Sequence, residues 1–168
     1  EPPNELCVGI FKARGLAAKD KSLVGTGGSS DPYCVLEVAG TTMKRRTKVK
    51  QGTLEPVWKE LFTLPLSAER PPGRDPPALV ITCMDRDALS SDDHMGAATI
   101  PLDKWAADPA REAERLWVPL EHVEGKSENV SGEVCVVVFW RHDAARAFSP
   151  FEAEDPPPGK EVNELRVG

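Results

Sequence analysis

Short apolar stretches recur along the chain at fairly even spacing, and Pro, Gly and Asp residues separate them. Stretches of this length between turn-forming residues are typical of β-strands. Eight such strands with almost no helical pattern predict an all-β domain, either an antiparallel sandwich or a closed barrel. The predicted strands are residues 5–16, 33–40, 41–50, 57–66, 78–85, 95–102, 115–121 and 132–140.

Three segments interrupt or end this pattern. Residues 103–114 look helical, but Pro109 limits a helix there to a turn or two. The stretch ERPPGRDPP (69–77) predicts a loop, because its prolines cannot donate to a sheet ladder. After Trp140 the alternation stops, and a Pro-rich stretch follows that reads as a linker.

The end of the chain nearly repeats its beginning, since NELRVG follows the linker and NELCVG lies near the start. A repeated unit indicates a tandem array of the same domain. We therefore expect one domain at 1–143, an inter-domain linker at 144–162, and the start of a following repeat at 163–168.

Composition narrows the class of protein. The chain has 168 residues, of which 40% are hydrophobic, so one domain with a real core is expected. A formal net charge of −6 disfavours nucleic acid as a partner. No apolar run approaches the length of about 18 residues that spans a bilayer. Each of the four cysteines lies alone in an apolar run, which predicts buried free thiols in a reducing, cytoplasmic compartment.

An acidic cluster follows the predicted strand 78–85. The stretch MDRDALSSDDHMG (84–96) contains four aspartates. Two carboxylates about 4 Å apart repel by about 4 kcal/mol at an effective dielectric constant near 20, so a cation would favour their meeting. Oxygen-only ligands on loops suit Ca²⁺. The alternative is a solvated acidic loop that binds no metal. The segment lacks the spacing of acidic residues that an EF-hand calcium loop requires.

A second loop strengthens the calcium interpretation, because it adds aspartates before the strand 33–40. Taken together, the motifs resemble the C2 domain, the calcium- and phospholipid-binding sandwich of protein kinase C, synaptotagmins and phospholipases. The resemblance covers residues 4–140 and implies an eight-stranded antiparallel β-sandwich of type II topology. The motifs that carry it are ARGL…D…SDPY, TKV, TLEPVWKELFTL, VITCMDRD…DDHMG and WVPL.

The resemblance also implies a ligand set for two calcium ions, with room for a third. We call residues 15–31 the first loop and 86–92 the third loop. The interval between the two aspartates of the first loop, Asp20 and Asp31, is longer than usual in the family, so we expect Asp20 to be displaced or mobile in the metal-free state. The implied carboxylate ligands are Asp20, Asp31, Asp85, Asp87 and Asp93, with Asp92 as a sixth, peripheral one, and the main-chain carbonyls of Lys19 and Arg86 add to them.

The stretch KRRTKVK (44–50) concentrates five cations in an acidic protein. On a strand, Lys44, Arg46, Lys48 and Lys50 would share one face, and the first three are the candidate lipid contacts. They predict either a solvated face or a cluster for anionic headgroups, including phosphoinositides, although Val35 replaces a lysine common in lipid-binding relatives. The apolar loop residues Leu23, Val24 and Leu89 either pack locally or enter a membrane surface. The large aromatic residues Trp58, Trp117 and Phe62 are expected in the core.

These features predict a calcium-dependent module that docks to acidic phospholipid membranes as an electrostatic switch, cytoplasmic with peripheral membrane association. Neighbouring C2 domains in the same chain are further expected partners. The alternative is a protein–protein interaction module in which calcium is structural or absent. An enzyme is disfavoured, because the three histidines are scattered and no nucleophile accompanies them.

Overall fold

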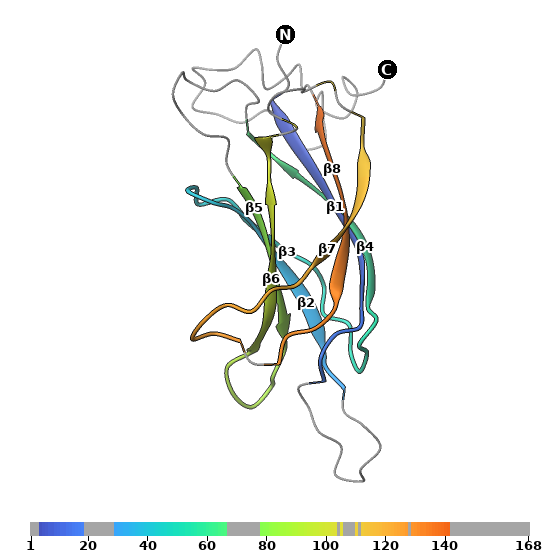
Figure 1. Cartoon of the computed structure of the whole chain (residues 1–168), viewed down its shortest axis with the longest axis vertical. Coiled ribbons are helices and arrows are strands. Elements are labelled where there is room, and N and C mark those ends of the chain that lie inside the picture. The colour runs from blue at the N-terminus through green and yellow to red at the C-terminus, as the bar shows by residue number, and fades with distance from the viewer. Residues whose placement is uncertain are drawn as a thin grey trace, which may run out of the picture.

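The computed structural model describes residues 4–18, 29–66, 78–103, 105, 110, 112–127 and 129–141. Two four-stranded antiparallel sheets pack face to face (Figure 1). This arrangement confirms the predicted eight-stranded antiparallel β-sandwich. The strands are β1 (Glu5–Arg14), β2 (Pro32–Val38), β3 (Lys44–Arg46), β4 (Val57–Leu64), β5 (Ala78–Asp85), β6 (Asp93–Pro101), β7 (Glu114–Pro119) and β8 (Glu133–Arg141).

The order of strands is β4-β1-β8-β7 in one sheet and β3-β2-β5-β6 in the other. The first and last strands are therefore neighbours, and they pair over the length of β1, from Glu5 opposite Arg141 to Arg14 opposite Glu133. The type II permutation that the resemblance implies stays a prediction. In the second sheet, β5 lies between β2 and β6, which places the end of β5 beside the starts of both neighbours.

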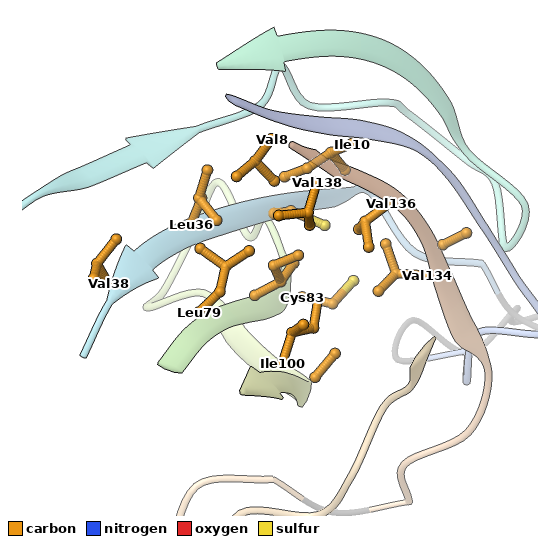
Figure 2. Close-up of a cluster of buried hydrophobic side chains, with 14 of the residues drawn as sticks. Val8, Ile10, Leu36, Val38, Leu79, Cys83, Ile100, Val134, Val136 and Val138 are labelled. Carbon is orange, nitrogen blue, oxygen red and sulfur yellow. The ribbon is translucent and has the colours of Figure 1, made fainter. Parts of the chain in front are cut away.

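Alternation along the strands builds the core between the two sheets. On β5, Leu79, Ile81 and Cys83 are buried while the residues between them are partly exposed. Val134, Val136 and Val138 of β8 meet them from the other sheet (Figure 2). Full burial of each such aliphatic side chain contributes about 1.5–3 kcal/mol. The core therefore holds the strand ends, and the loops that follow them, in fixed positions.

Strand β3 is shorter than the predicted strand 41–50. It ends at Arg46, because the side chain of Thr47 turns inward and its hydroxyl accepts the N–H of Cys34 at 2.8 Å. The Thr47 N–H still donates to the Cys34 carbonyl at 2.9 Å. Regular pairing stops there, so Lys48 lies beyond the strand, outside the alternation of Lys44 and Arg46.

Trp58 is buried as predicted and Phe62 packs partly buried against the core, but the prediction for Trp117 was wrong. Trp117 lies half-buried on the outer face of its sheet, where the guanidinium of Arg14 stacks 3.8 Å from the ring centroid. Its neighbours Leu116 and Val118 supply the contacts with the core instead.

The four cysteines are free and buried, which confirms their predicted burial. No helix among the described residues is long and apolar enough to cross a membrane. The predicted loop at 69–77, half of the helical segment 103–114, the linker at 144–162 and the repeat at 163–168 lie outside the described residues.

Candidate functional site

The register of the second sheet brings aspartates at or directly beside the ends of three strands to one end of the sandwich, the lower end in Figure 1. Asp85, the last residue of β5, pairs with Pro32 on one side and with Asp93 on the other. Asp31 directly precedes Pro32, so its carboxylate is carried to the same end. We call this group, with Asp87 of the third loop, the acidic end.

Hydrogen bonds fix Asp31 and Asp85 against each other. Asp85 is 1% exposed, and its Oδ1 accepts the N–H of Asp31 at 2.7 Å. The N–H of Arg86 donates to the Asp31 carbonyl at 3.0 Å, and the N–H of Gly52 donates to Asp31 Oδ1 at 2.7 Å. These backbone donors link the two residues to each other and to the loop that carries Gly52.

Asp87 is held differently, by donors of its own loop. Its Oδ1 accepts the N–H of Leu89 at 2.9 Å, and its Oδ2 accepts the hydroxyl of Ser90 at 2.8 Å. The N–H of Leu89, followed by the Ser90 hydroxyl, lowers the pKa of Asp87 below its usual value. The side chain is therefore ionised at neutral pH and already satisfied by protein donors.

Asp92 faces strand β2. Its Oδ1 accepts the N–H of Asp87 at 2.9 Å, and its Oδ2 accepts the hydroxyl of Tyr33. The Tyr33 hydrogen bond, and then the Asp87 N–H, lowers the pKa of Asp92, and the charges of Arg46 and Arg86 act in the same direction. Burial, together with this hydrogen bond, raises the pKa of Tyr33 to about 12.

The structure thus brings four of the predicted carboxylate ligands to one end, and places Arg86 beside them. Asp92 is at the same end but turned toward Tyr33. Asp20 and Lys19 lie outside the described residues. Within the described ranges, no three Asp, Glu, His or Cys side chains are arranged to hold a metal ion between them. An ion at this end would need a ligand from the first loop or a rearrangement of the third.

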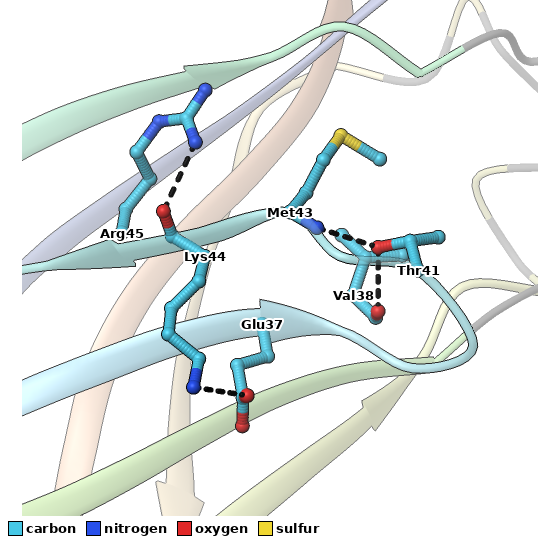
Figure 3. Close-up of polar contacts among 6 residues, drawn as sticks. All are labelled: Glu37, Val38, Thr41, Met43, Lys44 and Arg45. Atoms are coloured by element: carbon cyan, nitrogen blue, oxygen red, sulfur yellow. Dashed lines mark hydrogen bonds and ion pairs between the residues drawn. The ribbon is translucent and has the colours of Figure 1, made fainter.

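We call Lys44, Arg46 and Lys48 the basic edge, because they lie on or directly after the edge strand β3. Lys44 forms an ion pair with Glu37 of β2, with Nζ and Oε1 3.2 Å apart (Figure 3). The Arg46 guanidinium lies 4.4 Å from the ring centroid of Tyr33. Sequence reasoning missed the role of Glu37, which opposes Lys44 only through the β2–β3 register. Part of the basic charge is therefore already compensated.

The third loop presents an apolar tip. Leu89 is 97% exposed, so the alternative that it packs locally is wrong. It is flanked by the polar and acidic residues of the loop, and nothing in the described fold covers it. The other two predicted tip residues, Leu23 and Val24, lie outside the described residues.

The fold and these loops define the class of this protein as an antiparallel β-sandwich that carries its charged groups at one end and along one edge. The family model described as "C2 domain" matches residues 4–120, which is more than half of the chain. The chain therefore belongs to the C2 domain family, as the sequence motifs predicted.

Curated relatives agree with this assignment. Rab11 family-interacting protein 1 of Rattus norvegicus is 31% identical over 159 residues, which cover 91% of this chain and 23% of that protein. RasGAP-activating-like protein 1 of Homo sapiens is 32% identical over 142 residues, covering 83% of this chain and 16% of that protein. Synaptotagmin-1 of Rattus norvegicus is 32% identical over 133 residues, which cover 79% of this chain and 29% of that protein. The chain thus spans less than a third of each of these relatives.

Solved structures show the same fold. The calcium-bound pair of C2 domains from extended synaptotagmin 2 matches with a TM-score of 0.65 and 24% identity, covering 83% of this chain and 46% of that one. Human GIVD cytosolic phospholipase A2 matches with a TM-score of 0.63 and 22% identity, covering 86% of this chain and 17% of that one.

Proposed function

We propose that this C2 domain is a calcium-dependent module that docks to acidic phospholipid membranes. The observation that carries the proposal is the strand register that sets Asp31, Asp85 and Asp93 at one end of the sandwich, beside the fully exposed Leu89. Several carboxylates therefore lie close together, next to an apolar tip. A hard cation and a membrane surface together would satisfy both features.

The donor set suits calcium. The carboxylates of Asp31, Asp85, Asp87 and Asp93 and the carbonyl of Arg86 are all oxygen ligands, and Ca²⁺ accepts six to eight of them. The first loop would add Asp20 and the carbonyl of Lys19. Asp87 would exchange the N–H of Leu89 and the hydroxyl of Ser90 for the ion, so its side chain is the part expected to move. Bound calcium would supply positive charge and open coordination positions for phosphate oxygens.

Electrostatics then provides the switch. With Asp20 and Asp92 included, six aspartates give this end up to six negative charges without calcium, which repel an acidic membrane. Two calcium ions supply four positive charges and bring the local potential close to neutral. The switch is therefore the removal of a repulsion, and salt should weaken the docking that remains electrostatic.

The basic edge would add a contact that needs no calcium. Each basic residue near an anionic leaflet contributes about 1 kcal/mol. Arg46 and Lys48 are exposed, whereas Lys44 shares its charge with Glu37. The Lys44–Glu37 ion pair, and Val35 in place of the lysine common in lipid-binding relatives, favour general attraction to acidic lipid over selective binding of phosphoinositides.

A protein-interaction module is the second candidate, and the outer face of the β4-β1-β8-β7 sheet favours it. Val57 and Leu61 of β4 are 47% and 57% exposed, and in the same sheet Arg14 of β1 stacks on Trp117 of β7. The relative Rab11 family-interacting protein 1 is named for binding another protein. The predictions of a non-enzymatic domain, a cytoplasmic location and neighbouring C2 domains in the chain stand beside either candidate.

Co-sedimentation with vesicles separates the two candidates. The domain is mixed with phosphatidylserine-rich or purely neutral vesicles, each with calcium or with a chelator. We expect pelleting that requires both calcium and acidic lipid. Equal sedimentation under all four conditions, at calcium concentrations up to the millimolar range, would remove the membrane proposal and leave the protein-interaction module.

A further inference from the structure

Asp92 differs from the other aspartates of this end in how its carboxylate is used. Both of its oxygens accept hydrogen bonds from protein groups on different segments. Oδ1 accepts the N–H of Asp87, 2.9 Å away, and Oδ2 accepts the hydroxyl of Tyr33. The side chain therefore ties the two ends of the third loop together and ties the loop to strand β2.

Tyr33 is a rigid anchor for this connection. It lies within β2, opposite Met84 of β5, and is 5% exposed. The guanidinium of Arg46 covers its ring from β3 at 4.4 Å. Because Tyr33 is buried on a strand that is paired on both sides, its hydroxyl has little freedom, so the sheet sets the position of Asp92.

Asp87 is the residue that this connection controls. Its N–H is held by Asp92, while its carboxylate is held by Leu89 and Ser90 of the same loop. The backbone of Asp87 is thus fixed to the sheet, while its carboxylate is held only by exposed groups. Such an arrangement lets the carboxylate turn toward an ion without moving the chain that carries it.

We propose that Asp92 is a positioning residue of the calcium site and not a ligand. Its hydrogen bonds to Tyr33 and to the Asp87 N–H hold the third loop in the form that presents Asp87. This inference rests on the proposed calcium binding. It changes the expected contribution of Asp92 to calcium affinity, because the geometry of its hydrogen bonds matters more than its negative charge.

Asparagine at this position distinguishes geometry from charge. In Asp92→Asn, the amide oxygen can accept the Asp87 N–H, and the amide NH₂ can donate to the phenol oxygen of Tyr33, which also accepts hydrogen bonds. The variant keeps both connections and loses the charge. Asp92→Ala loses both connections and the charge, and Tyr33→Phe keeps the charge but loses the anchor.

Calorimetric titration with calcium chloride, without lipid, compares the three variants with the wild type. A positioning role predicts an affinity for Asp92→Asn within about threefold of wild type, and about tenfold weaker binding for Asp92→Ala and Tyr33→Phe, the size expected for a hydrogen bond to a charged group. A ligand role predicts that Asp92→Asn loses as much affinity as Asp92→Ala and that Tyr33→Phe binds normally. That result would overturn the positioning role alone.

Amide hydrogen exchange in the calcium-free protein gives a readout independent of the ion. We expect faster exchange at the Asp87 N–H in Asp92→Ala and Tyr33→Phe and wild-type exchange in Asp92→Asn, with exchange at Ile81 in the core unchanged throughout. Equal exchange at Asp87 in all four proteins would refute the connection to the sheet. A wild-type protein that binds no calcium would overturn the proposed function and the positioning role together.

Discussion

The exposed tip of the third loop allows a quantitative test of membrane insertion. Leu89 is 97% exposed, so replacing it with alanine should leave the free energy of unfolding unchanged. The substitution removes three side-chain carbons, and each CH₂ transferred from water contributes about 0.8 kcal/mol. Full insertion would therefore be worth about 2.4 kcal/mol, or about 50-fold in affinity. Partial insertion at the level of the headgroups should cost about five- to tenfold.

Leu61 provides a matched control, since it is the other strongly exposed leucine among the described residues, at 57%, and it lies on the outer face of β4. Binding of Leu89→Ala and Leu61→Ala to phosphatidylserine-rich vesicles is measured at saturating calcium over a range of salt concentrations. Only Leu89→Ala should bind more weakly, and the difference should persist at high salt, because transfer of apolar area is not screened. Equal binding by the two variants and the wild type would refute insertion of this tip.

Three further outcomes follow from the site and the fold. The double variant Asp85→Asn with Asp87→Asn should lose calcium binding by calorimetry, because two of the proposed ligands lose their charge. Retained binding would end the proposed ligand set. Glu37→Gln removes the ion-pair partner of Lys44 and should strengthen calcium-independent binding to vesicles about fivefold. Unchanged binding would show that the basic edge does not touch lipid. Arg141→Leu removes the guanidinium that lies 3.1 Å from the carboxylate of the fully buried Glu5. The variant should have a free energy of unfolding about 3 kcal/mol lower in denaturant titrations. A loss below about 1 kcal/mol would contradict this reasoning.

All eight strands could be predicted from the sequence, because alternation with a period of two is a local property of the chain. The clustering of Asp85, Asp87 and Asp93 could also be predicted, since one short segment carries all three. The motif around Tyr33 placed Asp31 at the same end through resemblance to a family. These features need no knowledge of which strands are neighbours.

The tertiary structure decided which side chains are buried and which distant residues become partners, because both depend on strand register and on which face of a strand meets the core. Trp117 lies between two apolar neighbours, so the sequence does not show which face of the strand is buried, and the size of Trp117 suggested burial. In the structure, Leu116 and Val118 pack against the core instead. The Lys44–Glu37 pair and the Tyr33–Asp92 hydrogen bond each join segments far apart in the sequence. Such partners meet only once hydrogen bonding between strands has fixed the register, and no local pattern encodes that choice.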